Sequence, residues 1–247
     1  MALTPTTRTP LLISFSGIDG AGKTTQIDLL TQWLSEAGVR VRVVGFWDEV
    51  ALLTSLRERI GHTLFRGDQG VGTPGKPIER KDKNIQSWYM TPFRLLLSSL
   101  DAIGMAIVMS RIRRQQSADV VIFDRYFYDQ VANLNVNTRL VRGWIKLCSR
   151  FVPAPDIAYL LDADPVLARE RKPEYPVAFL YSSRASYLAL SRIVSMTVIP
   201  PGSPEDVLSR IRRGIEIVFA GLVSLGYHND DHACASAFLR DEGRGTV

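Results

Sequence analysis

The chain has 247 residues, of which 46% are hydrophobic and 22% are charged, a balance that is typical of a globular protein and excludes a disordered or fibrous one. Its formal charge of +5 comes from 30 Lys and Arg against 25 Asp and Glu, and the Arg residues are spread over several segments. This excess indicates solvated helix faces or a site for anionic small molecules, and we expect no nucleic-acid partner.

Runs and spacings of apolar residues predict strands that alternate with helices. In chain order we expect a strand at residues 11–15, a helix at 23–37, a strand at 39–46, a helix at 51–65, an irregular segment at 66–92, a helix at 93–116, a strand at 120–123, mostly helix at 126–151, a strand at 156–161, a short helix at 164–172, a helix at 181–191, a strand at 194–199 and a last helix at 203–225.

This alternation predicts an α/β fold, a three-layer sandwich around a mostly parallel five-stranded sheet, with ligands bound beyond the carboxyl ends of the strands. We expect one domain at residues 11–226, a disordered extension at residues 1–10 and a flexible tail at residues 227–247.

The cysteines and the apolar segments indicate the compartment. Cys148 and Cys234 are widely separated and lack the spacing of a zinc or redox motif, so we expect a reducing environment. The apolar run after Arg8 is too short for a signal peptide, and charges interrupt the apolar stretch at residues 93–110, which fits a buried helix better than a membrane span. We expect a cytoplasmic protein without membrane binding.

The most specific motif is G-x-x-x-x-G-K-[ST] at residues 17–24, where every required position is filled and a predicted strand runs into a predicted helix. Glycines let backbone N–H groups surround phosphate oxygens at the helix N-terminus, and a lysine can reach the β and γ phosphates. The motif therefore predicts nucleoside triphosphate binding, with ATP as the donor. The candidate contacts are Gly17, Asp19, Gly20, Ala21, Gly22, Lys23, Thr24 and Thr25.

A second polar group follows the third predicted strand. Thr24 in the loop and Asp124 at the end of that strand carry the hard oxygen ligands that Mg²⁺ prefers, and the two lie close together if this strand neighbours the first. Arg125 can hold a phosphoryl group with two hydrogen bonds, or the Asp124–Arg125 pair can simply close the strand.

The chain resembles the thymidylate kinase family over about residues 11–225. The matching motifs are residues 17–26, Asp124-Arg125-Tyr126, Leu161-Asp162 and residues 203–207. The resemblance implies a P-loop NTPase fold with a small lid at about residues 169–180, and ATP with Mg²⁺ as cofactors.

The same resemblance assigns roles to individual residues. It places Asp19 at the acceptor sugar or phosphate and Arg125 at the acceptor phosphate, with Lys23 as the third catalytic candidate. In the lid it points to Arg169 and Arg171, which can neutralise charge on the transferred group or form a solvated helix face. A homodimer is also implied.

Three positions depart from the family pattern. On the middle helix, Asp101 is kept without the stacking ring and the arginine that accompany it in the family. After Tyr126 the chain offers Asp129, Gln130 and Asn133 where the family has other polar residues, and we take Gln130 and Asn133 as substrate contacts. Trp47-Asp48-Glu49 stands where the family has a segment with a cation, and Trp47 either stacks on a base or belongs to the core.

These features leave three hypotheses. The first is a nucleoside monophosphate kinase that converts dTMP to dTDP, in which catalysis rests on positioning and charge stabilisation. The second keeps the fold and the ATP site but assigns another nucleotide, a nucleoside or a small hydroxylated metabolite as acceptor. The third is a non-enzymatic regulatory protein, which would use residues 66–92 as an interaction surface.

Overall fold

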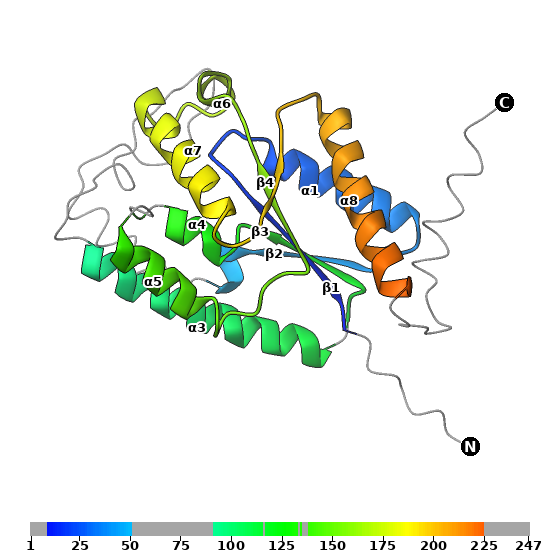
Figure 1. Cartoon of the computed structure of the whole chain (residues 1–247). Helices are drawn as coiled ribbons and strands as arrows, with labels where there is room; N and C mark the ends of the chain where they lie inside the picture. The colour runs from blue at the N-terminus through cyan, green and yellow to red at the C-terminus, as the bar shows by residue number, and fades with distance from the viewer. Residues whose placement is uncertain (1–8, 51–90, 116, 133, 135–137, 225–247) are drawn as a thin grey trace.

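The computed structural model describes residues 9–50, 91–115, 117–132, 134 and 138–224 (Figure 1). The predicted helix at residues 51–65, nearly all of the segment at 66–92, the candidate Asn133 and most of both terminal segments lie outside the described residues.

Five parallel strands form the sheet, in the order β2-β3-β1-β4-β5. Their bounds are β1 Leu11–Ser16, β2 Val41–Gly45, β3 Val120–Asp124, β4 Ile157–Leu161 and β5 Thr197–Ile199. In the register, Asp124 is level with Phe15 of β1 and with Gly45 of β2. The predicted α/β class and five-stranded sheet are confirmed, and the carboxyl ends of three neighbouring strands meet at one edge.

Eight helical segments within the described residues connect and cover these strands. They are α1 Lys23–Glu36, the π-helical turn η1 Phe46–Val50, α3 Thr91–Gln115, α4 Phe127–Ala132, α5 Arg139–Cys148, α6 Pro165–Arg171, α7 Val177–Ser191 and α8 Pro204–Ser224.

Some boundaries differ from the expected ones. Helix α7 begins four residues before the predicted residue 181, directly after Pro176, since a proline can precede a helix whose first N–H groups need no partner inside the helix. Residues 126–151 hold two helices, because Thr138 starts a new one by accepting a hydrogen bond from the Val141 N–H.

The sheet separates two apolar clusters, as expected for a three-layer sandwich. On one face, Ile13 and Phe15 pack with residues of α1 and α8. On the other face, Leu12, Val121 and Phe123 pack with residues of α3, α4, α5 and α7 (Figure 1). The alternation of side chains along β1 explains why one strand supplies both cores.

Helix α3 is the long apolar helix that we expected to be buried. By length and composition alone, its residues Leu95–Gln115 could cross a membrane, but core helices of soluble proteins share these properties. Met105, Val108, Met109 and Ile112 of this helix are buried in the core cluster. The inner side of α3 is therefore accounted for by the fold.

Candidate active site

The loop between β1 and α1 is held against the backbone of β4 and α6 by two glycines. Gly17 has a φ of +145° and Gly20 a φ of +83°. A Cβ atom would lie 2.5 Å from the Leu161 carbonyl oxygen at Gly17, and 2.2 Å from the Ala168 carbonyl oxygen at Gly20. Both positions require glycine, because a side chain would meet rigid backbone.

Lys23 lies inside this loop, with 7% of its surface exposed. Its Nζ atom donates hydrogen bonds of 2.8 Å to the Gly17 carbonyl and 2.9 Å to the Ile18 carbonyl. Burial, and then the positive charge of Arg125, lower the pKa of Lys23 to about 8, against the attraction of nearby carboxylates. The carbonyls of Gly17 and Ile18 therefore hold the ammonium group inside the loop.

Arg125 follows β3 in an unusual backbone conformation, with a φ of +70°. Its N–H donates a 3.1 Å hydrogen bond to the Phe15 carbonyl, which ties it to the start of the phosphate-binding loop. Its guanidinium forms an ion pair with Asp19 and lies 3.7 Å from Asp129. Burial works against the charged guanidinium, but the two carboxylates outweigh burial and raise the pKa of Arg125. The resemblance implied that Asp19 and Arg125 both lie at the acceptor site, and the two side chains are in direct contact.

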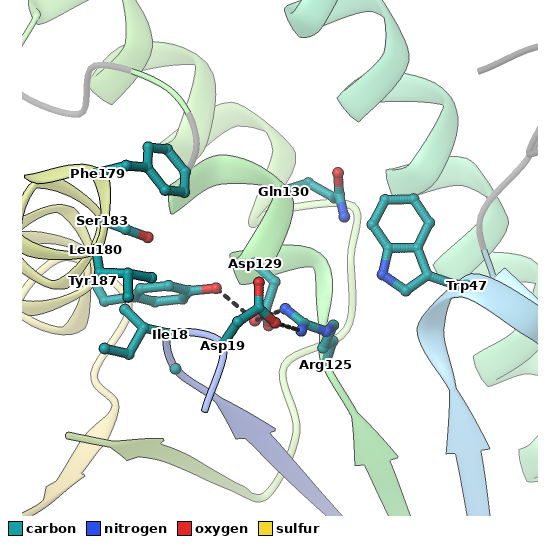
Figure 2. A pocket seen from close by; sticks show the side chains of 11 residues that line it. Ile18, Asp19, Trp47, Arg125, Asp129, Gln130, Phe179, Leu180, Ser183 and Tyr187 are labelled. Carbon is teal, nitrogen blue, oxygen red and sulfur yellow. Dashed lines mark hydrogen bonds and ion pairs between the residues drawn. The ribbon is translucent and has the colours of Figure 1, made fainter. Parts of the chain in front are cut away.

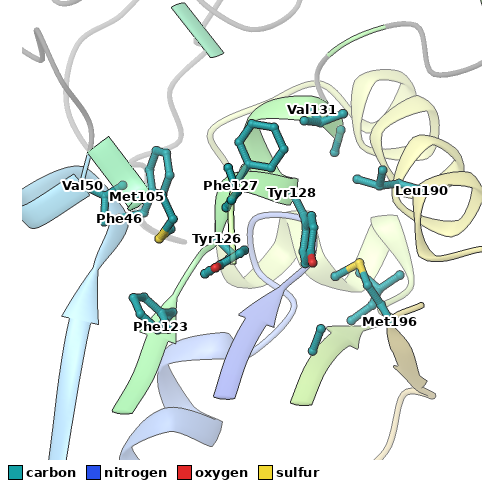
Figure 3. Packing of buried hydrophobic residues seen from close by; sticks show 14 of the residues in the cluster. Phe46, Val50, Met105, Phe123, Tyr126, Phe127, Tyr128, Val131, Leu190 and Met196 are labelled. Carbon is teal, nitrogen blue, oxygen red and sulfur yellow. The ribbon is translucent and has the colours of Figure 1, made fainter. Parts of the chain in front are cut away.

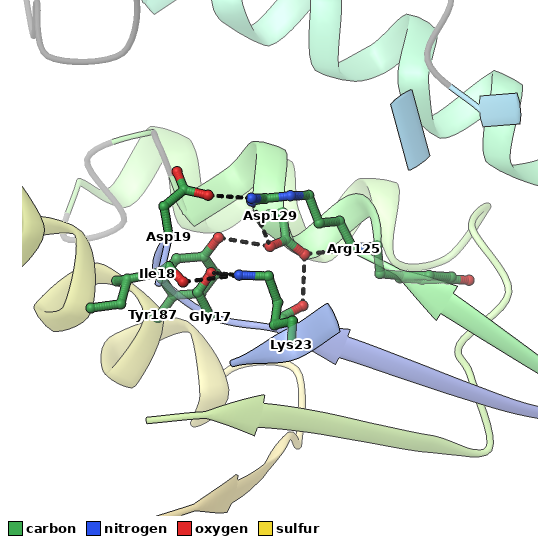
Figure 4. A network of polar contacts seen from close by, with 9 residues as sticks. Gly17, Ile18, Asp19, Lys23, Arg125, Asp129 and Tyr187 are labelled. Atoms are coloured by element: carbon green, nitrogen blue, oxygen red, sulfur yellow. Dashed lines mark hydrogen bonds and ion pairs between the residues drawn. The ribbon is translucent and has the colours of Figure 1, made fainter. Parts of the chain in front are cut away.

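Asp129 connects three elements around Arg125 (Figure 4). Its Oδ2 atom accepts hydrogen bonds from the Ser16 hydroxyl at 2.7 Å and the Tyr126 N–H at 3.0 Å. Its Oδ1 atom accepts one from the Tyr187 hydroxyl at 2.7 Å. Burial, followed by the negative charge of Asp129, raises the pKa of Tyr187 well above its usual value, so this hydroxyl stays a donor.

These residues lie at a cleft that is lined by residues from several parts of the chain (Figure 2). Five predicted candidates line it: Gly17, Asp19, Trp47, Arg125 and Gln130. Helix α7 contributes Phe179, Leu180, Ser183 and Tyr187. Figure 2 shows Trp47 on one side of the cleft and Phe179 on the other, with Gln130 between them.

Trp47 is a cleft residue and not a core residue. Its surface is 39% exposed, and its ring meets Phe46 edge-on at 5.5 Å between centroids. The buried Phe46 thus holds Trp47 at the rim. Of the two interpretations of Trp47, the structure favours a ring that a planar ligand could contact.

An apolar cluster beneath α4 fixes the position of the residues after β3 (Figure 3). Phe127 is fully buried, and its ring lies 5.8 Å from that of Trp144. The Tyr126 ring lies 5.3 Å from that of Phe123 and 5.1 Å from that of Tyr128. A six-residue helix has little stability of its own, so this packing holds Asp129 and Gln130 in place.

The arginines of the predicted lid lie at different distances from the loop. Arg171 donates a 2.9 Å hydrogen bond to the Gly20 carbonyl, whereas Arg169 donates to the Tyr175 carbonyl. Arg184 of α7 forms a bidentate pair with Asp162, with hydrogen bonds of 2.6 and 2.7 Å. Arg171 is thus the lid candidate that touches the phosphate-binding loop in this conformation.

The magnesium candidates have suitable chemistry. Thr24, near the start of α1, is exposed, and Asp124, at the end of β3, is partly buried. Among the described residues, no group of three or more His, Cys, Asp and Glu side chains is placed to hold a metal. Mg²⁺ bound with a nucleotide takes one or two protein ligands and completes its shell with phosphates and water, so a hydroxyl and a carboxylate suffice.

Some candidates are placed differently from what the sequence suggested. Asp101 is buried within α3 with 0% exposure and does not belong to the residues that line the cleft. Sequence reasoning missed the roles of Asp129 and Tyr187 and the contribution of Phe179. Asp129 occupies a position that the family pattern had already marked as divergent, but the helical spacing of residues 177–191 gave no sign that they face the loop.

Comparison with known proteins identifies relatives of this chain, although no protein-family model matches it. A protein of Methanosphaera stadtmanae named probable thymidylate kinase is 27% identical over 203 residues, which are 80% of this chain and 93% of the relative. The probable thymidylate kinases of Archaeoglobus fulgidus and Sulfurisphaera tokodaii are 24% and 29% identical, over 83% and 82% of this chain and 95% and 90% of their own lengths.

Over most of its length the chain is thus similar to proteins of the thymidylate kinase family. A solved structure of thymidylate kinase from Ehrlichia chaffeensis matches with a TM-score of 0.53 and 21% identity, and the match covers 84% of this chain and 99% of that chain. This likeness concerns the fold. The fold of this chain therefore matches nearly the whole length of that solved structure.

Proposed function

We propose that the chain is an ATP-dependent nucleoside monophosphate kinase that transfers the γ-phosphoryl group of ATP to dTMP, forming dTDP and ADP. The observation that carries the proposal is the Asp19–Arg125 pair beside Lys23, at the mouth of a cleft lined by Trp47 and Gln130. The relatives named thymidylate kinase support the same activity.

The position of each residue supports a specific role in phosphoryl transfer. The backbone of residues 17–24 and Lys23 bind the donor phosphates, while Arg125 orients the acceptor phosphate toward them. An oxygen of the acceptor phosphate forms the new bond to the γ-phosphorus as the bond to the ADP oxygen breaks. Because that oxygen is already an anion, the site needs positioning and charge stabilisation more than a general base.

Thr24 and Asp124 would hold Mg²⁺, which supplies positive charge to the donor phosphates when it is bound. Arg171 would add positive charge from the lid, since it already reaches the Gly20 carbonyl. Trp47 and Gln130 would contact the acceptor base, by stacking and by amide hydrogen bonds.

A different acceptor is the second candidate, and one observation favours it. Asp101, the remaining part of the family's base-reading group, is buried inside α3 and does not line the cleft. Residues other than those of the family pattern would then contact the acceptor base. The alternative acceptor is another nucleotide or a nucleoside.

A coupled assay of ADP release with ATP and Mg²⁺ separates the two candidates. The panel comprises thymidylate, the other nucleoside monophosphates and thymidine. ADP release that depends on thymidylate supports the proposal, and dependence on another acceptor supports the alternative. No acceptor-dependent release would contradict both. Asp119→Asn is a suitable control, because Asp119 pairs with Arg40 before β3, at the opposite end of that strand from the cleft.

We further propose a cytoplasmic enzyme that forms a homodimer. Leu96, Ile103 and Ile107 are exposed on the outer side of α3 and could pack against a second copy. Sedimentation of wild type and Ile103→Glu tests this, since a dimer through α3 would dissociate in the variant, whereas a monomeric wild type would contradict the proposal.

A further inference from the structure

Asp129 has an environment that helix geometry explains only in part. It is 2% exposed and lies at the third position of α4, where an acidic side chain commonly accepts a hydrogen bond from the N–H of the preceding cap residue. The bond from the Tyr126 N–H to Oδ2 fits that local role. Nothing in helix capping requires the contacts of the other oxygen.

The other oxygen, Oδ1, contacts two residues that line the cleft. It accepts the Tyr187 hydroxyl at 2.7 Å and lies 3.7 Å from Nη1 of Arg125. Tyr187 belongs to α7, which follows the lid, whereas Arg125 follows β3. One carboxylate thus joins the acceptor-side arginine to a helix that is distant in sequence.

The two carboxylates beside Arg125 lie on different elements. Asp129 is fixed by Ser16, Tyr126 and Tyr187 in addition to the arginine. Asp19 lies in the glycine-rich loop at the cleft. A phosphate that binds Arg125 must compete with the Asp19 carboxylate for the guanidinium. The hydrogen bonds that hold Asp129 come from Ser16, Tyr126 and Tyr187, so they would remain if the phosphate displaced Asp19.

The backbone at Arg125 is in an unfavourable conformation. A φ of +70° is unfavourable for a residue with a long side chain, at a cost of about 1–3 kcal/mol that the surroundings must offset. Asp129 accepts a hydrogen bond from the N–H of Tyr126, the residue directly after Arg125. Asp129 therefore supports Arg125 from its backbone side and from its guanidinium side.

We propose that Asp129 is a positioning residue for phosphoryl transfer, which together with Tyr187 fixes the Arg125 guanidinium where the acceptor phosphate must be held. The inference rests on the proposed function. Asp129 contacts neither substrate in this account, and it acts through Arg125.

Asp129→Asn is the informative variant. The Asn Oδ1 atom can take the place of Oδ2 and keep the bonds from Ser16 and Tyr126, while its NH₂ group would face Arg125 as a second donor. We expect kcat to fall about 10- to 100-fold, because a misplaced acceptor is a poor nucleophile. The KM values for thymidylate and ATP should stay within about threefold of wild type, since neither substrate loses a direct contact.

Tyr187→Phe removes the other support of the same oxygen without changing any charge. We expect kcat to fall in the same direction by about 3- to 10-fold, the range for the loss of one ordinary hydrogen bond, because Tyr187 acts only indirectly, through Asp129 and Arg125. This variant also tests the positioning role of Asp129 if Asp129→Asn does not fold. Asp119→Asn is the matched control and should behave as wild type.

The outcomes are distinct. Unchanged kcat in Asp129→Asn, or an unchanged kcat in Tyr187→Phe, would overturn the proposed anchoring. A joint rise in both KM values, with a lower melting temperature, would show a structural role alone and would also overturn it. The wild-type reaction is measured before any variant is compared. If the wild-type chain transfers no phosphoryl group to thymidylate, the proposed function itself is contradicted.

Discussion

The guanidinium of Arg171 in α6 donates a 2.9 Å hydrogen bond to the backbone carbonyl of Gly20 in the phosphate-binding loop. This contact brings a lid cation to the place where the donor phosphates are proposed to bind. Because Arg171 is exposed, its loss should affect the reaction more than the fold.

Arg171→Ala should therefore lower kcat with little change in stability. We expect a loss of about 100- to 1,000-fold, the range for removing one donor that stabilises a transition state. Steady-state kinetics and a melting curve measure the two effects. Arg213→Ala on α8 is the control, since Arg213 is an exposed arginine that lines no part of the cleft. Equal kcat values for the two variants would remove Arg171 from the mechanism.

Lys23→Ala should abolish transfer and leave a folded protein. The Lys23 ammonium bonds only loop carbonyls among the contacts described, so its removal opens no apolar cavity. We expect turnover to fall at least about 100-fold, since a donor aimed at the phosphates is lost. The exposed Lys146 of α5 offers the control Lys146→Ala. Undiminished transfer by Lys23→Ala would rule out the assigned role.

The pH dependence of ATP use should report Lys23. Burial, followed by the Arg125 charge, lowers its pKa to about 8, so the ammonium is present below that pH and is lost as pH rises through it. Because kcat/KM reports the free enzyme, kcat/KM for ATP should decline above about pH 8. Tyr126 and Tyr128 do not titrate in this range, since burial raises the pKa of each, that of Tyr128 to about 12. A profile that is flat to pH 10 would contradict this expectation.

The stability of the ligand-free protein should show the opposite trend. The unfolded chain holds the Lys23 proton up to its ordinary pKa of 10.5, and the folded chain only to about 8. Between these values the unfolded state binds more protons, so this group makes the free energy of unfolding rise with pH. Denaturant titrations of wild type and Lys23→Met at pH 7.5 and 10 measure the effect. The variant should lack the rise, and an identical pH response in both proteins would contradict the assignment.

Two glycine substitutions should have opposite effects on stability. Gly20→Ala places a Cβ atom 2.2 Å from the Ala168 carbonyl oxygen and forces alanine to a φ of +83°, which should destabilise by about 1–3 kcal/mol and impair ATP binding. Gly143→Ala lies within α5, with nothing within 4 Å of the new Cβ, and should stabilise by about 0.5–1 kcal/mol. Thermal or denaturant unfolding tests both, and a neutral Gly20→Ala would show that the loop is more adaptable than this geometry allows.

The fold and one half of the site could be predicted because they depend on local patterns. Apolar runs predicted the strands, and the rule that ligands bind beyond their carboxyl ends placed Trp47 and Asp124 at one edge of the sheet, where Trp47 lines the cleft. The motif at residues 17–24 requires a strand before it and a helix after it, and the structure has both. Such features need no knowledge of distant contacts.

The other half depends on contacts that the sequence does not encode locally. Tyr187 meets Asp129 across 58 positions, and the direction of α7 decides which of its side chains face the cleft. Asp101 shows the reverse case, since the resemblance suggested a ligand contact and the packing of α3 buries the carboxylate. Helix boundaries also shifted, because Thr138 and Pro176 create starts that apolar spacing alone does not show.

Direct identification of the product tests the central claim most directly. The wild-type chain would be incubated with γ-labelled ATP, Mg²⁺ and thymidylate, with thymidine in a parallel reaction, and the nucleotides would be separated. The account predicts label in dTDP, formed in equal amount to ADP and absent when thymidylate is omitted. Labelled dTMP formed from thymidine with no labelled dTDP formed from thymidylate, or ADP formed without label in any acceptor product, would contradict it.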